Sequence, residues 1–171
     1  MPKILLSGKP KVGKTTIIKK VLSSFAKTSC GGFYTEEVKA KGKRIGFKVV
    51  STNGEEGILA DINHKSPYRV SKYYVNVADF ERVALQAVVN AEQAKDLIII
   101  DEIGKMELFS PKFKQAVEEI FTKSQKKILA TIPNCDIPLV KRLKSLPDTE
   151  VIEITEENRD IIVSELIGKL Q

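Results

Sequence analysis

The sequence predicts an α/β fold in which a mostly parallel central sheet is covered by helices and interrupted by an antiparallel hairpin segment. An apolar stretch at Lys3–Ser7 leads into a glycine-containing loop and then into an amphipathic segment at Ile17–Phe25. The run Leu97–Ile100 is unbroken and apolar, as expected for a central parallel strand buried on both faces. Strand-type and helix-type segments alternate elsewhere, which is the pattern of α/β domains.

Length and composition set the class of protein. The chain has 171 residues, of which 42% are hydrophobic and 29% charged, so we expect one globular domain spanning residues 1–171. Cys30 and Cys135 have no metal-ligand spacing and are too few for a disulfide framework. The longest apolar run is far below the roughly 20 residues that cross a bilayer, and the N-terminus has no signal-peptide pattern. We therefore expect a cytoplasmic protein without a membrane partner, with a monomer favoured.

The segment Gly8–Thr15 reads GKPKVGKT and matches the phosphate-binding pattern G-x-x-x-x-G-K-[ST] in the required strand-then-helix context. Its glycines let successive backbone N–H groups point inward at a helix N-terminus, where phosphate is favoured. Lys14 would reach the β- and γ-phosphates of a nucleotide, and the Thr15 hydroxyl would ligate Mg²⁺. An ordinary glycine-containing turn is the alternative, and the flanking pattern makes it the weaker one.

Three strand-type pieces follow Gly32, and the Asn53-Gly54 turn between two of them is a strong hairpin signal. Glu36 and Glu37 on the first piece either face the phosphates or end a strand in solvent, and we favour the solvated strand end. Residues Asn63–Tyr74 show no clear pattern. The three pieces are Phe33–Lys39, Ile45–Thr52 and Gly57–Ala60.

Two carboxylates, Asp101 and Glu102, directly follow the Leu97–Ile100 strand. Open α/β sheets bind ligands in the crevice at the edge where such a strand ends. In phosphate-loop proteins an aspartate at this place holds the hydrated Mg²⁺, and Glu102 could act as general base toward the attacking water. The alternative, that both only cap a strand, leaves the matching loop unexplained. The preceding helix is expected at Val77–Ala94, with Asp79 as its cap.

Further elements follow in the C-terminal half. Ser110-Pro111 begins a helix cleanly, with a cap and then proline in the first turn. Thr131, on the strand Ile128–Ile132, would place a hydroxyl near the crevice, where it could sense the γ-phosphate or orient the water. The other expected elements are a helix at Asp136–Ser145, a strand at Val151–Ile154 and a last helix capped by Thr155.

The formal net charge is +6, with basic residues concentrated in residues 1–77 and an acidic excess in 78–171. A polyanionic partner is one interpretation. A solvated lysine-rich surface with a few lysines at a nucleotide site is the favoured one, because the chain has no basic run and no aromatic-interleaved patch. We therefore do not expect nucleic-acid binding.

Five stretches of the chain resemble the small thermophile-type nucleoside-triphosphatase family, and the resemblance runs over nearly the whole chain. They are Gly8–Thr16, Gly31–Val38, Ile45–Phe47, Ile100–Phe109 and Thr155–Arg159. The block DEIGKMEL at residues 101–108 is the most specific part, because many unrelated proteins share the phosphate loop. The resemblance implies a RecA-like phosphate-loop fold, a three-layer sandwich, and slow hydrolysis of ATP, GTP, CTP and UTP to diphosphate and phosphate with Mg²⁺.

The resemblance also implies which residues bind the nucleotide. Many such loops carry a glycine at the position of Lys11, so we expect reduced loop flexibility to affect turnover more than binding. Lys105 or Arg159 could supply the positive charge that stabilises the transferring phosphoryl group, or could be a surface or packing residue. The nucleotide-binding residues would be Gly8, Lys9, Pro10, Lys11, Val12, Gly13, Lys14, Thr15 and Thr16, then Ile100, Asp101, Glu102, Ile103, Gly104, Lys105, Met106 and Glu107.

Two alternative functions stay open beside a hydrolase that uses Lys14, Glu102 and Thr131. A nucleotide or small-molecule kinase would replace water by an acceptor hydroxyl, but such enzymes need arginines in a lid, and Arg142 is the only arginine between residues 110 and 145. A nucleotide-dependent switch or binding module would hydrolyse little, and a guanine-specific switch would need an N-K-x-D signature that the sequence lacks.

Overall fold

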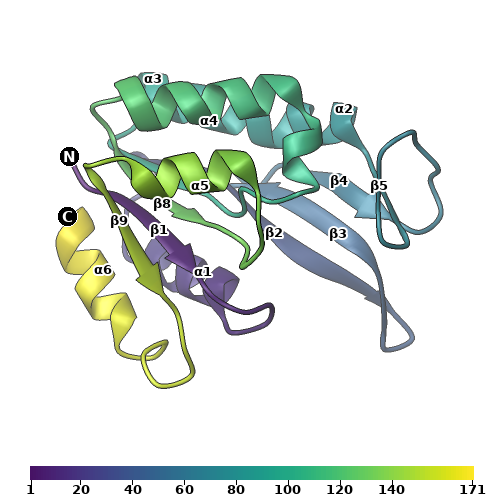
Figure 1. The fold of residues 1–171 in the computed structure, drawn as a ribbon, viewed down its shortest axis with the longest axis horizontal. Coiled ribbons are helices and arrows are strands. Elements are labelled where there is room, and N and C mark those ends of the chain that lie inside the picture. The colour runs from purple at the N-terminus through teal and green to yellow at the C-terminus, as the bar shows by residue number, and fades with distance from the viewer.

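A nine-stranded sheet forms the middle of the molecule, and helices pack on both of its faces (Figure 1). The structure is a computed structural model that describes residues 1–171. The strands, in the order β5-β6-β4-β3-β2-β7-β8-β1-β9 across the sheet, are β1 (Lys3–Ser7), β2 (Cys30–Ala40), β3 (Lys43–Ser51), β4 (Glu56–Asp61), β5 (Arg69–Val70), β6 (Tyr73–Val75), β7 (Leu97–Ile100), β8 (Lys127–Thr131) and β9 (Thr149–Glu153).

Five α-helices lie between these strands and a sixth follows the last one, and none of them is long and apolar enough to span a membrane. A π-helical turn at Glu81–Leu85 joins two of the helices, and a 3₁₀ turn at Glu107–Phe109 precedes another. The helices are α1 (Lys14–Ser23), α2 (Val77–Phe80), α3 (Gln86–Ala94), α4 (Pro111–Lys123), α5 (Pro138–Ser145) and α6 (Ile162–Leu170).

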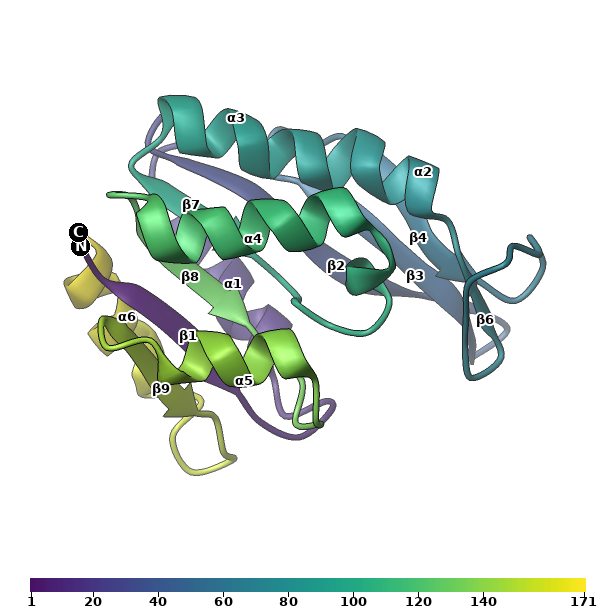
Figure 2. The ribbon, with the colours of Figure 1, turned by 45° about the horizontal axis from the view of Figure 1, so that its top comes forward.

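The five strands β2, β7, β8, β1 and β9 run parallel. Helices α1 and α6 cover one face of this part, and α3, α4 and α5 cover the other (Figure 1, Figure 2). Leu97 and Ile99 of β7 join the buried cluster under α1 and α6, whereas Ile98 and Ile100 join the cluster under the other three helices. The predicted α/β three-layer fold, with a central strand buried on both faces, is therefore confirmed.

An antiparallel arm extends the sheet beyond β2, as the sequence predicts. β3 pairs antiparallel with β2 and β4, and β6 pairs antiparallel with β4 and β5. Figure 2 places this arm at the end of the sheet away from the two chain termini. The short strands β5 and β6 overlap the stretch Asn63–Tyr74, whose sequence has no clear pattern because two or three residues are too few to form one.

Two expected helix caps are wrong. The side chain of Asn76 caps α2 by accepting a hydrogen bond from the backbone N–H of Asp79 at 3.0 Å, and Asp79 instead pairs with Arg82 at 2.8 Å. Thr155 does not cap the last helix, because α6 begins seven residues later at Ile162. Thr155 and Asn158 instead exchange hydrogen bonds of 2.8 and 3.3 Å and close a turn.

The close approach of β2 to β7 requires glycine at position 32. A Cβ atom there would lie 1.9 Å from the carbonyl oxygen of Ile99, and the residue has φ +127°. We expect Gly32→Ala to lower the free energy of unfolding by about 3 kcal/mol or more, because the clash is with central backbone. Gly168→Ala is the matched control. Its Cβ meets open space in α6, so it should raise stability by about 0.5 to 1 kcal/mol. Urea unfolding followed by circular dichroism would measure both, and equal midpoints would contradict the prediction.

Candidate active site

The glycine-containing loop connects β1 to α1 at the carboxyl edge of the sheet. Gly8 and Gly13 have φ values of +149° and +117°, and a Cβ at Gly8 would lie 2.9 Å from the carbonyl oxygen of Ile154. Lys11 has φ 65°, a left-handed conformation that costs a non-glycine residue about 1 to 2 kcal/mol. This chain therefore has a lysine in a strained conformation at a position where many such loops carry glycine.

Lys14, the first residue of α1, joins the loop to two strand ends. Its Nζ atom donates to the carbonyl oxygens of Gly8 at 3.2 Å and Ile132 at 2.8 Å. The same atom forms an ion pair with Glu102 Oε2 at 3.1 Å, and the Lys14 side chain is only 10% exposed. Lys14 and Glu102, 88 positions apart in the chain, are thus in direct contact.

Asp101 lies at the end of β7 and is 2% exposed. The Thr15 hydroxyl donates to its Oδ2 at 2.8 Å, and the Thr131 hydroxyl donates to its Oδ1 at 2.6 Å. Burial is the main reason that the pKa of Asp101 rises from 3.8 to about 6, although the hydrogen bonds from Thr131 and Thr15 oppose the rise. The two hydrogen bonds therefore hold the Asp101 carboxylate in place, but its negative charge is poorly compensated by positive charge.

The neighbouring oxygens of Thr15 and Asp101 suit a small hard cation. Mg²⁺ prefers oxygen ligands and is commonly bound by one or two carboxylates together with phosphates and water. No group of three or more His, Cys, Asp or Glu side chains is placed to hold a metal by itself. A Mg²⁺ ion here would therefore complete its coordination with phosphate oxygens and water, and its charge would stabilise the ionised form of Asp101.

Glu102 and Glu107 converge on Gly104. A Cβ atom at Gly104 would lie 2.8 Å from Glu102 Oε1 and 2.9 Å from Glu107 Oε1, so glycine leaves the space that both carboxyl groups use. Glu107 is 4% exposed. Burial, with the negative charges of Glu102 and Asp101, raises the pKa of Glu107 well above its ordinary value. The family resemblance alone places Glu107 in the nucleotide-binding stretch, and no pattern in the sequence indicates that it is buried.

Two adjoining cavities open at this edge of the sheet and share Lys14, Thr15, Thr35 and Phe47 in their walls. The larger, of about 600 Å³, lies between the loop and the β2–β3 arm. The smaller, of about 330 Å³, is also lined by Asp101, Glu102, Lys105, Met106 and Glu107. By contrast, Ile100 and Ile103 are fully buried in the core, so a ligand in either cavity would meet only their backbone.

The interpretation of Glu36 and Glu37 as a solvated strand end is wrong. Strand β2 continues to Ala40, and both carboxylates line the larger cavity beside the loop. Glu36 pairs with Lys19 and with Lys48, and Glu37 pairs with Arg44 at 3.0 Å. Strand β3 supplies Lys48 and Arg44 to these pairs, and α1 supplies Lys19.

Lys105 and Arg159 have different surroundings. Lys105 is exposed and lines the smaller cavity with Glu102. Arg159 donates to the carbonyl oxygen of Val12 at 3.2 Å, and its Cδ lies 3.7 Å from where a Cβ of Gly13 would stand. Arg159 therefore supports the loop through Val12, whereas Lys105 lines the same cavity as the carboxylates.

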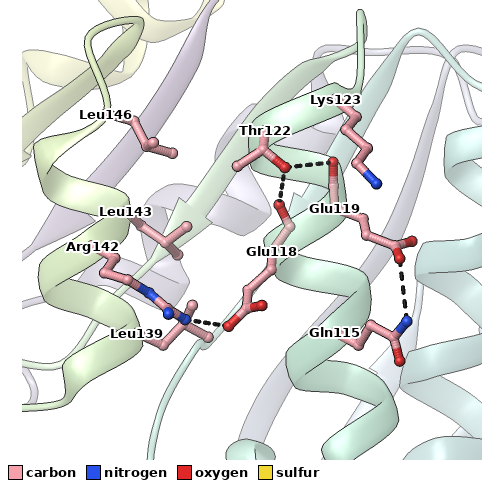
Figure 3. A pocket seen from close by; sticks show the side chains of 9 residues that line it. All are labelled: Gln115, Glu118, Glu119, Thr122, Lys123, Leu139, Arg142, Leu143 and Leu146. Carbon is pink, nitrogen blue, oxygen red and sulfur yellow. Dashed lines mark hydrogen bonds and ion pairs between the residues drawn. The ribbon is translucent and has the colours of Figure 1, made fainter.

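Arg142 lies away from this edge. It forms an ion pair with Glu118 across a cavity of about 510 Å³ between α4 and α5, whose floor includes Leu139, Leu143 and Leu146 (Figure 3). Arg142 lines neither cavity at the phosphate loop. The one arginine between residues 110 and 145 is therefore not placed as a lid residue over phosphates.

Comparisons with known proteins agree with this geometry. A model of the family described as NTPase matches residues 3–167. Nucleoside-triphosphatase THEP1 of Thermotoga sp. (strain RQ2) is 50% identical over 169 residues, which are 99% of this chain and 95% of that protein. The human cancer-related nucleoside-triphosphatase is 38% identical over 183 residues, covering 98% of this chain and 96% of that protein. The crystal structure of THEP1 from the hyperthermophile Aquifex aeolicus has a TM-score of 0.90 at 41% identity and covers 99% of each chain.

The raised pKa of Asp101 predicts a pH dependence of stability. Between its ordinary 3.8 and the folded value of about 6, the folded state keeps a proton that the unfolded state has lost, so stability falls as pH rises. Relative to Asp101→Asn, the metal-free wild type should therefore lose free energy of unfolding from about pH 4 to about pH 7. Urea titrations of both proteins at each pH would measure the change.

Asp148 provides a control of opposite sign, because its hydrogen bond from Lys3 holds its pKa below 3.8. Relative to Asp148→Asn, the wild type should gain stability as pH rises to about 5 and should change little between about pH 5 and pH 7, because both pKa values of Asp148 lie at or below 3.8. If the difference in free energy of unfolding between the wild type and Asp101→Asn does not change with pH, the assignment of a raised pKa to Asp101 is contradicted.

Proposed function

We propose that the loop after β1 and the carboxylates after β7 hydrolyse ATP, GTP, CTP and UTP with Mg²⁺, because the chain belongs to the nucleoside-triphosphatase family. The chain is a nucleoside-triphosphatase, as its relatives are named, and the breadth of substrate and the metal are the proposed parts. The observation that carries the proposal is the contact of Lys14 with Glu102, beside that of Thr15 with Asp101.

The first step is an exchange of partners at Lys14. Phosphate oxygens in the loop would face the inward N–H groups and the start of α1, both of which favour anions. They would compete with Glu102 for Lys14 Nζ, now 3.1 Å from Oε2. Lys14 would then neutralise the β- and γ-phosphates, and Glu102 would be released beside the terminal phosphate.

The released Glu102 carboxylate would act as general base. The water oxygen attacks the γ-phosphorus, its proton passes to Glu102, and the bond to the β–γ bridging oxygen breaks with release of the diphosphate. A Mg²⁺ ion bound by Thr15 and Asp101 would supply charge that stabilises the leaving diphosphate. Thr131 is fully buried and donates to Asp101, so we assign it the positioning of that carboxylate in place of direct contact with phosphate or water.

The different surroundings of Lys105 and Arg159 separate their roles. Lys105 lines the cavity that contains Glu102, so its ammonium would stabilise charge on the transferring γ-phosphoryl group. Arg159 would keep the loop in its anion-binding shape through Val12. All of these residues would contact phosphate or metal, and none would contact the nucleotide base. This supports hydrolysis of all four triphosphates.

Phosphate release from the four triphosphates, with Mg²⁺ and with excess EDTA, tests the proposal. Glu102→Gln should slow release by roughly 10²- to 10⁴-fold because it removes the general base, while binding of a fluorescent ATP analogue persists. Lys14→Ala supplies the blank, and Glu119→Gln, an exposed carboxylate on α4, should behave as wild type. Unchanged release in Glu102→Gln would remove Glu102 from the mechanism.

Lys105→Met and Arg159→Met should differ in kinetic signature. Loss of Lys105 should lower kcat by roughly 10²-fold with little change in KM, because its charge acts mainly on the transition state. Loss of Arg159 should mainly raise KM, because the loop that binds the ground-state phosphates relaxes. Steady-state kinetics with ATP would measure both, and the reverse pattern would exchange the two assignments.

A further inference from the structure

Apolar side chains line part of the smaller cavity, which Glu102 also lines. Phe47 on β3, Leu59 on β4, Val70 on β5 and Met106 after β7 contribute to it. Phe47, Val70 and Met106 are only partly buried, although they pack against the main core cluster. The antiparallel arm therefore brings apolar side chains to the cavity that Glu102 also lines.

The cavity is larger than hydrolysis requires. A water molecule occupies about 30 Å³ of liquid volume, whereas this cavity measures about 330 Å³ and would also hold the metal and the γ-phosphoryl group beside Asp101 and Lys14. Pockets for small organic ligands begin at about 300 Å³ and are lined mainly by apolar side chains with a few convergent polar groups. The cavity reaches this size, and five of its thirteen lining residues are apolar, so its apolar part fits an organic molecule of modest size.

The position of the cavity indicates what such a molecule would meet. Lys14 and Thr15, which would hold the end of the triphosphate and its metal, line both cavities, whereas Glu102 lines only the smaller one. A molecule in the smaller cavity would therefore lie beyond the γ-phosphate and beside the proposed general base. This is the place of a second substrate in phosphoryl transfer.

The charges in the wall favour a neutral molecule. The Glu102 carboxylate would repel an anionic acceptor, and Lys105 is already assigned to the γ-phosphoryl group. The apolar side chains would bind a ring, and Glu102 would accept a hydrogen bond from a hydroxyl. A nucleoside or an aromatic alcohol has these features.

We propose that the smaller cavity binds an uncharged hydroxyl compound with a compact ring body, and that the protein transfers the γ-phosphoryl group to it. This inference rests on the proposed function, because it uses the same loop, metal site and base, with Lys105 in the role that lid arginines have in nucleotide kinases. The hydroxyl oxygen forms a bond to the γ-phosphorus, and its proton passes to Glu102. The bond to the β–γ bridging oxygen breaks, and the diphosphate leaves with that electron pair. Water takes the acceptor's place when the cavity holds none.

The experiment is ³¹P NMR of the full chain turning over Mg·ATP with adenosine or benzyl alcohol as probe, and with glycerol as a hydroxyl compound that has no ring. Inorganic phosphate and phosphomonoester are read in the same sample. We expect a phosphomonoester with at least one ring probe and none with glycerol. Inorganic phosphate without a phosphomonoester from either ring probe would overturn the acceptor site and leave the hydrolase intact. Absence of both products would contradict the hydrolase itself.

Cavity-filling variants locate the acceptor. Val70→Trp would fill the smaller cavity, so the ratio of phosphomonoester to inorganic phosphate should fall by about tenfold or more. Leu146→Trp is the matched control, because it fills the cavity between α4 and α5 (Figure 3) and should leave the ratio unchanged. A ratio that Val70→Trp does not alter would overturn the assignment to this cavity.

Discussion

The ion pair between Lys14 and Glu102 is the contact on which the candidate site depends. β1 and β7 are not neighbours, because β8 lies between them in the sheet. The loop after β1 and the carboxylates after β7 therefore meet across the end of β8. That strand end takes part in both contacts: the carbonyl of Ile132 accepts from Lys14, and the hydroxyl of Thr131 holds Asp101. Three parallel strands in this order place one lysine, two hydroxyls and two carboxylates at a single edge.

The site concentrates negative charge that the protein alone does not balance. Asp101, Glu102 and Glu107 lie close together, and burial raises the pKa of Asp101 and Glu107. Lys14 is the one cation within ion-pair distance of Glu102. Binding of metal and triphosphate would redistribute these charges, since Mg²⁺ would compensate Asp101 while phosphate draws Lys14 away. We infer that the chain keeps an electrostatically costly arrangement because that arrangement is complementary to its bound substrate.

Local sequence patterns predicted those parts of the molecule that depend on local structure. Gly8–Thr15 could be recognised because glycine, lysine and threonine occur at fixed spacing between a strand and a helix. Asp101 could be placed because it ends an unbroken apolar run. The partners of Glu36 on β3, the burial of Glu107 and the support that Thr131 gives to Asp101 depend on strands that pair across the sheet. No spacing along the chain encodes those contacts, and the family resemblance gave only the stretch that contains Glu107.

The most direct test is a crystal structure of the chain with Mg²⁺ and a non-hydrolysable ATP analogue. We expect Lys14 Nζ to bond phosphate oxygens and to contact Glu102 no longer. We also expect Mg²⁺ at Thr15 and Asp101, and the Glu102 carboxylate facing the γ-phosphorus from the side of the smaller cavity. An analogue bound elsewhere, or one bound in the loop with the Lys14–Glu102 ion pair intact, would contradict the exchange of partners at the centre of the mechanism.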